Sequence, residues 1–181
     1  MYPFIRLATE LLKFRAAPAL GIRDTHISHH LCLPWDLDPW NELNNGRTLT
    51  LYDLGRIPAG RRLGLDRALA AQGWGMTVAG VSVRYRRRIQ AFERVEMQTR
   101  CIGWDKRFLY TEQSLWKKAG AAPDCANHIL LRSAVTSRTG IVEPARLAAV
   151  MGLGDSPALP DWAQAWIAAD ATRPWPPSRV G

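Results

Sequence analysis

The opening residues of the chain carry an apolar side chain at every third or fourth position. This spacing, from Phe4 to Phe14, predicts an amphipathic helix that ends near Pro18 and Gly21. Two placements fit such a helix: it packs on the protein body or a partner subunit, or it lies on a membrane surface with basic side chains toward lipid phosphates (Arg6, Lys13 and Arg15). We favour packing, because docked terminal helices are common and this one is not strongly cationic.

The next segments alternate between strand, loop and helix signals. Residues 24–33 combine apolar and β-branched side chains and predict a first strand, whereas residues 33–46 are rich in Pro, Asp and Asn and predict a loop. A helical pattern begins at Asn45 and is interrupted at Pro58 and Gly60. Residues 65–72 then predict a further short helix, capped by Gly73.

After Gly73 the apolar positions repeat every second residue, as they do in β-strands. Alternation marks strands around residues 81–86, 95–99 and 108–116. A turn at residues 119–123 precedes a last long strand from about Asn127 to Ser137. A strand, a helix and then four strands in succession predict an α+β protein, in which an antiparallel sheet packs on one helix.

The C-terminal part changes character again. A short helix follows Pro144, and a proline-rich segment comes after it. Within that segment Trp162 and Trp166 lie four residues apart and share one helical face, and two large apolar rings need a surface to cover. We therefore divide the chain into a domain at residues 1–150, which includes the N-terminal helix, and a Pro- and Trp-rich tail at 151–181 that packs on the domain or on a partner subunit.

The charge of the chain is uneven. The formal net charge is +8, and residues 84–118 hold ten basic and four acidic side chains. A local basic face of this kind favours an anionic partner, and phosphates of nucleic acid, lipid or a nucleotide cofactor all qualify. Only Tyr85 and Phe92 lie between the arginines, which is a poor set of stacking platforms and disfavours nucleic acid.

Cysteine and histidine usage narrows the chemistry. The three cysteines form no CxxC pair, which favours a reducing, cytoplasmic location, and no segment has the length of a membrane span or the pattern of a signal peptide. His26 and His30 are four apart, a spacing that suits metal binding on a helix rather than on a strand, so we expect no metal. Cys32 has no evident orienting partner for nucleophilic catalysis.

Three segments resemble a known family. The stretch Asp36-Leu-Asp-Pro-Trp-Asn-Glu-Leu-Asn-Asn-Gly-Arg resembles the D-x-D…H-x-N-N-x-x-Y signature of hot-dog acyl-CoA thioesterases of the 4-hydroxybenzoyl-CoA thioesterase group. Residues 83–96 and 103–110 resemble the Y-R-R-S-L…F-E…R-x-R-L-L-G-W-D pattern of its thioesterase-superfamily-member branch. Glu42 stands at the histidine position and Thr48 at the tyrosine position. The resemblance covers about residues 24–143 and implies a hot-dog fold, an antiparallel sheet wrapped around a long central helix.

The resemblance also implies an active site. Asp38 is the candidate general base or nucleophile, and the helix start at Asn44, Asn45 and Gly46 is the candidate oxyanion site. Burial near tryptophans 35 and 40 is expected to raise the pKa of Asp38 and make it a better base. The alternatives are that Asp36 and Asp38 cap and turn a loop and that the asparagines cap the helix. Glu42 orients the site, acts as a second acid, or is a solvated loop residue.

The basic strand region supplies candidate ligands for coenzyme A phosphates. We select Arg86, Arg88 and Arg107, and the alternative is a solvated face that protects a sheet edge. The resemblance thus implies an acyl-CoA thioesterase that works as a homodimer or a dimer of dimers, with the coenzyme A thioester as its substrate and no further cofactor. The alternative function is a non-catalytic hot-dog module that binds acyl-CoA or a protein partner, and contact with a membrane surface is not favoured.

Overall fold

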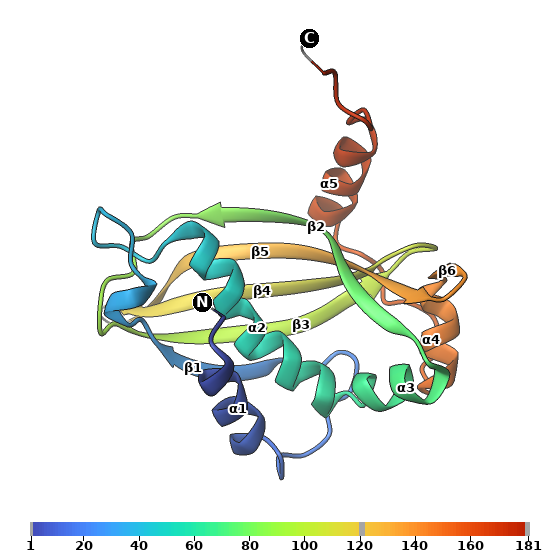
Figure 1. Ribbon diagram of the computed structural model, residues 1–181, viewed down its shortest axis with the longest axis horizontal. Helices are drawn as coiled ribbons and strands as arrows, with labels where there is room; N and C mark the ends of the chain where they lie inside the picture. Colours follow the sequence, from blue (N-terminus) through green and yellow to red (C-terminus); the bar gives the residue numbers. More distant parts are fainter. Residues whose placement is uncertain (1, 120–121, 180–181) are drawn as a thin grey trace.

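The computed structural model describes residues 2–119 and 122–179, which form one antiparallel sheet and five α-helices (Figure 1). The strands lie in the order β1-β3-β4-β5-β2, with β6 paired to the end of β5. The helices are α1 (Phe4–Lys13), α2 (Asn45–Arg62), α3 (Leu65–Gln72), α4 (Pro144–Val150) and α5 (Asp161–Ala171). The strands are β1 (His26–Leu31), β2 (Gly75–Tyr85), β3 (Arg94–Trp104), β4 (Leu109–Ala119), β5 (Ala122–Ser137) and β6 (Gly140–Val142).

Helix α2 lies across one face of the sheet, which we call the inner face (Figure 1). Alternate residues of the strands point to it, so that Ile129 and Leu131 of β5 join the same buried cluster as Leu54 of α2. The contact is close at Gly55, where a Cβ atom would lie 2.5 Å from Sδ of Met97. The predicted α+β arrangement of an antiparallel sheet on one helix is confirmed.

The opposite, outer face is covered only in part. Leu130, between the two inward residues of β5, points outward and packs in a cluster with Tyr110 and with Ala163 of α5. Trp166 lies against this cluster, and Arg132 of β5 forms an ion pair with Asp170 of α5 at 2.6 Å. The tail therefore docks on the outer face through its helix, which projects past the sheet near β2 (Figure 1).

Helix α1 packs on α2 and near β1, as favoured, but its buried face differs from the predicted stripe. Leu7 contacts the inner cluster, whereas Phe4 is 70% exposed and Glu10 is buried. The Arg6 guanidinium forms an ion pair with the buried carboxylate of Asp36, and the Tyr2 hydroxyl donates to Asp53 at 3.0 Å. These polar contacts set the rotation of the helix.

Several predicted boundaries were wrong. Helix α2 runs through Pro58 and Gly60 to Arg62, because the burial of Pro58 offsets the cost of a proline inside a helix. Strand β2 starts already at Gly75, strand β5 at Ala122, and the short strand β6 was not predicted. Part of the predicted turn, residues 120–121, lies outside the described residues. The short helix at 65–72 and its left-handed Gly73 cap are confirmed.

Candidate active site

The loop between β1 and α2 is closed by a buried carboxylate. Asp36 is fully buried and accepts hydrogen bonds from Nη1 of Arg6 at 2.7 Å, Nε of Arg47 at 2.6 Å and the Leu33 amide at 3.1 Å. Its own carbonyl accepts the Asn44 amide at 2.9 Å. The Asp36 side chain thus joins α1, the loop and the start of α2. These bonds hold the part of the loop after Asp36 in place.

Asp38 organises the tip of this loop. Its Oδ1 atom accepts the amides of Trp40 at 2.9 Å and Glu42 at 3.4 Å, and its own amide donates to the Glu42 carbonyl at 2.9 Å. Within residues 2–119 and 122–179, no hydrogen bond to Oδ2 is found. The Asp38 side chain is half-buried, whereas Trp35 and Trp40 are 71% and 73% exposed. The expected burial of Asp38 by these two rings is therefore not found within a single chain. Asp38 therefore caps the loop with Oδ1, while Oδ2 has no hydrogen-bond partner among the described residues.

The start of α2 presents unpaired backbone donors. Asn44 is the N-cap, since its Oδ1 accepts the Arg47 amide at 3.0 Å and its carbonyl accepts the Thr48 amide at 2.8 Å. The amides of Asn45 and Gly46 have no acceptor in the described part of the chain, and both residues are exposed. A helix end of this kind carries a partial positive charge that attracts an anionic oxygen. Asn44 is thus a cap, and the two residues after it supply free N–H groups.

A cleft of about 200 Å³ opens beside this helix start. Its walls are Glu42, Asn45 and Thr48 on one side and residues 85–89 on the other. Glu42 forms an ion pair with Nε of Arg88 at 2.9 Å, and the Tyr85 hydroxyl donates to the Asn45 carbonyl at 3.2 Å. Burial raises the pKa of Tyr85, which keeps its hydroxyl protonated as a donor. The structure therefore joins Glu42, Asn45, Arg86 and Arg88 in one cleft, next to the Asp38 loop.

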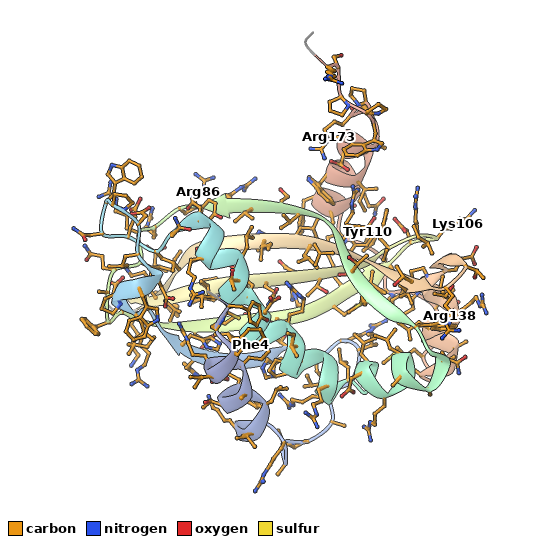
Figure 2. The ribbon with its side chains drawn as sticks, viewed as in Figure 1. Phe4, Arg86, Lys106, Tyr110, Arg138 and Arg173 are labelled. Atoms are coloured by element: carbon orange, nitrogen blue, oxygen red, sulfur yellow. The ribbon has the colours of Figure 1, made fainter. Side chains whose placement is uncertain are left out.

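Arg107 is not part of this cleft in a single chain. It lies in the β3–β4 turn, where its amide and that of Phe108 both donate to Oδ1 of Asp105 at 2.7 Å. Figure 2 shows Lys106, its neighbour in this turn, at the end of the sheet opposite Arg86. The three arginines selected from the sequence therefore do not form one cluster within one chain.

The group of side chains that fixes the loop is not evident from the sequence. Arg6 and Arg47 both bond Asp36, yet Arg6 precedes it by 30 positions and no local pattern relates them. From the sequence alone, Asp36 is expected only to turn the loop. The D-x-D spacing is a weak sequence signal for the burial of Asp36. Its partners, Arg6 and Arg47, are brought to it only by the fold. Asp53 and Arg56, three residues apart on α2, form an ion pair.

Outside this cleft, a further cavity, a metal site or a membrane-spanning helix could also indicate a function. A small apolar cavity of about 70 Å³ lies at the C-terminal half of α2, between Ala59, Leu63 and Trp104. The part of the chain that the structure describes contains no cluster of three or more His, Cys, Asp and Glu side chains able to hold a metal ion. Across the same residues, no helix combines the length and apolarity needed to cross a bilayer.

Comparisons with known proteins point to one family. Residues 32–167 match the family model of the thioesterase-like superfamily. Protein THEM6 of Xenopus laevis is 37% identical over 111 residues, which are 61% of this chain and 54% of that protein. Protein THEM6 of Danio rerio is 32% identical over 103 residues, or 57% of this chain and 51% of that protein. The chain thus spans about half the length of the curated relatives that it matches.

Solved structures show the same fold at low identity. A putative oleoyl thioesterase from Lactobacillus plantarum superposes with a TM-score of 0.66 at 16% identity, covering 87% of this chain and 59% of that one. A 4-hydroxybenzoyl-CoA thioesterase mutant, complexed with 4-hydroxybenzoyl-CoA, superposes with a TM-score of 0.62 at 11% identity, covering 70% of this chain and 98% of that one. The hot-dog fold implied by the sequence resemblance is confirmed.

Proposed function

Because this chain belongs to the thioesterase-like superfamily, we propose that it hydrolyses an acyl-CoA thioester to a carboxylic acid and coenzyme A. The observation that carries the proposal is the position of Asp38. One of its oxygens is tied to the loop backbone, and the other has no hydrogen-bond partner among the described residues. The same loop leads directly into the open amides of α2, so the carboxylate and the N–H donors lie on one continuous segment of the chain.

The chemistry follows from these groups. Asp38 takes a proton from a water molecule as that water attacks the acyl carbon, or Asp38 attacks directly and forms a mixed anhydride that water then cleaves. The carbonyl oxygen becomes an oxyanion, which the amides of Asn45 and Gly46 stabilise. The C–S bond then breaks, and the thiolate of coenzyme A leaves and takes up a proton. Glu42, held by Arg88, orients the loop in place of the family's histidine.

We further propose that two copies pair through β2. This strand is bonded to β5 on one side only in the described sheet, and Val78 is 50% exposed on it. A two-fold axis pairs β2 with its copy in antiparallel fashion and continues the sheet. In each copy, one end of the sheet carries the start of α2 and the opposite end carries Arg107. Antiparallel pairing places the first end of one copy beside the second end of its partner. Pairing therefore brings the partner's Arg107 toward the cleft that contains Arg86 and Arg88.

The test compares two loop aspartates. Asp38→Asn keeps the Oδ1 acceptor for the Trp40 amide but removes the base, whereas Asp24→Asn alters a matched loop cap, in which Oδ2 accepts the Gly21 amide at 2.7 Å. Against a panel of acyl-CoAs, we expect kcat to fall by about a hundredfold or more for Asp38→Asn and to stay unchanged for Asp24→Asn. Hydrolysis that is equal in wild type and Asp38→Asn removes Asp38 from the mechanism.

A second function is a module that binds acyl-CoA or a protein partner without turnover. The observations that favour it are the two departures from the family signature. The Glu42 carboxylate is engaged by Arg88, and the Thr48 hydroxyl in the cleft wall donates back to the Asn44 carbonyl at 3.1 Å. Tight binding of coenzyme A with no hydrolysis across the panel supports this alternative.

A further inference from the structure

The part of the outer face that α5 leaves open contains a polar cleft of about 430 Å³. It is separate from the inner face that holds α2. The cleft lies over the middle strands and the edge strand β2, and its lining includes Arg84, Arg86, Arg100, Glu112, Trp116 and His128. The reaction proposed above uses none of them except Arg86.

The register of the strands explains why these side chains meet. Arg84 of β2 is opposite His128 of β5, which is opposite Ser114 of β4. In the next row, Arg100 of β3 is opposite Glu112 of β4. Directly opposite residues of antiparallel strands point to the same face, so these side chains converge over the sheet.

A single carboxylate holds one guanidinium group and one imidazole ring in place. Oε2 of Glu112 accepts Nε of Arg100 at 2.6 Å, and Oε1 lies 2.7 Å from Nε2 of His128. Burial opposes ionisation, but the bonds from His128 and Arg100 hold the pKa of Glu112 below its ordinary value. Both oxygens are occupied and the acid is balanced by Arg100. Glu112 therefore does not repel an anion as a free carboxylate would.

Two cations and one aromatic ring remain available in this cleft. Within residues 2–119 and 122–179, the guanidinium groups of Arg84 and Arg86 form no ion pair with an acid. The indole N–H of Trp116 donates to Oγ of Ser114 at 2.8 Å, which fixes the ring and leaves its face as a stacking surface. Guanidinium groups suit phosphate oxygens, and a flat ring suits a nucleobase.

We propose that this outer-face cleft binds a phosphorylated adenosine, with Arg84 and Arg86 on the phosphates and Trp116 against the base. Two sources share this chemistry: the nucleotide end of a coenzyme A thioester, and a free nucleotide. Arg86 and Asn127 line both this cleft and the one at the start of α2, so the two clefts adjoin. The assignment to the nucleotide end of coenzyme A rests on the function proposed above. Binding of a phosphorylated adenosine in this cleft does not require that the protein hydrolyses a thioester.

The first experiment measures binding by calorimetry at near-physiological salt, using adenosine 3′,5′-bisphosphate, ATP and inorganic pyrophosphate as probes. We expect Arg84→Gln to weaken all three by about tenfold, or about 1.4 kcal/mol. Trp116→Leu is expected to weaken the two adenosine probes by a similar factor and to leave pyrophosphate unchanged. The control is Arg138→Gln, which removes the same charge from an exposed residue at the far end of the sheet from Arg86 (Figure 2).

The second experiment separates the two sources. If the coenzyme occupies the cleft, Arg84→Gln raises KM for an acyl-CoA but not for the corresponding acyl-pantetheine. If a free nucleotide occupies it, ATP binding depends on Arg84 while KM for the acyl-CoA does not. Phosphate binding that is lost in Arg84→Gln supports the inference even when no acyl-CoA is hydrolysed. Absence of binding by wild type, or an equal loss in Arg84→Gln and Arg138→Gln, overturns it.

Discussion

Two glycines of α2 provide a sharp test of how the helix rests on the sheet. Gly55 faces β3, and a Cβ atom there would lie 2.5 Å from Sδ of Met97 and 2.8 Å from Oγ1 of Thr99. Gly60 is about one and a half turns further on, and its Cβ would meet only the Leu65 side chain, at 3.4 Å from Cδ2 and 3.9 Å from Cβ, which are ordinary contacts. The same substitution, glycine to alanine, is therefore expected to have opposite effects at two positions of one helix.

The magnitudes follow from the contacts. Alanine in a helix interior is favoured over glycine by about 1 kcal/mol, so Gly60→Ala should stabilise the protein by up to this amount. Gly55→Ala gains the same term, but Met97 is fully buried and the Thr99 hydroxyl accepts a bond from Gln113 at 2.8 Å, so neither neighbour moves freely. Overpacking costs about 1–3 kcal/mol. Because the propensity term cancels, the difference between the two variants measures the clash alone.

The assay is urea unfolding followed by far-ultraviolet circular dichroism. With an m-value of about 2 kcal/mol/M, a clash of about 2 kcal/mol separates the two midpoints by about 1 M. Truncation of the neighbour, in Gly55→Ala combined with Met97→Ala, should recover part of the loss relative to the sum of the single changes. Equal midpoints for Gly55→Ala and Gly60→Ala would refute the close approach of α2 to β3.

Three further predictions concern the loop, the helix start and a buried histidine. Asp36→Asn removes a fully buried charge from between two partly buried guanidinium groups and should lower stability by about 3 kcal/mol. Asp66→Asn, in an exposed pair, should change stability by less than about 0.5 kcal/mol in urea unfolding. Asn44→Ala removes the N-cap bond and should lower the urea midpoint by the equivalent of about 1 kcal/mol; an unchanged midpoint contradicts the cap. Burial, aided by nearby cations, lowers the pKa of His26 to about 4 from 6.5, so the native state binds fewer protons than the unfolded state. Stability is then complete above pH 6.5 and falls as the pH drops toward 4, and His26→Gln should flatten this dependence in unfolding curves recorded across the window.

The candidate site was predictable where its residues are neighbours in the chain. The segment from Asp38 to Gly46 contains a loop aspartate, a helix cap and free helix amides, and each of these features depends on local backbone chemistry. Arg107 could not be placed in the same way, because its distance from Arg86 depends on which strand ends meet. The register that joins Arg84 to His128 is likewise a property of strand pairing.

The sequence by itself determined the order of the helices and of strands β1 to β5, the two faces of these strands and the start of the long helix. These features arise from side-chain periodicity and capping, which act over a few residues. Only the tertiary structure decided that α2 continues through Pro58, that Asp36 is neutralised by Arg6, and that a basic cleft forms on the outer face. Each of these depends on burial or on pairing between distant segments, and a free energy gained between distant segments has no signature in the local pattern.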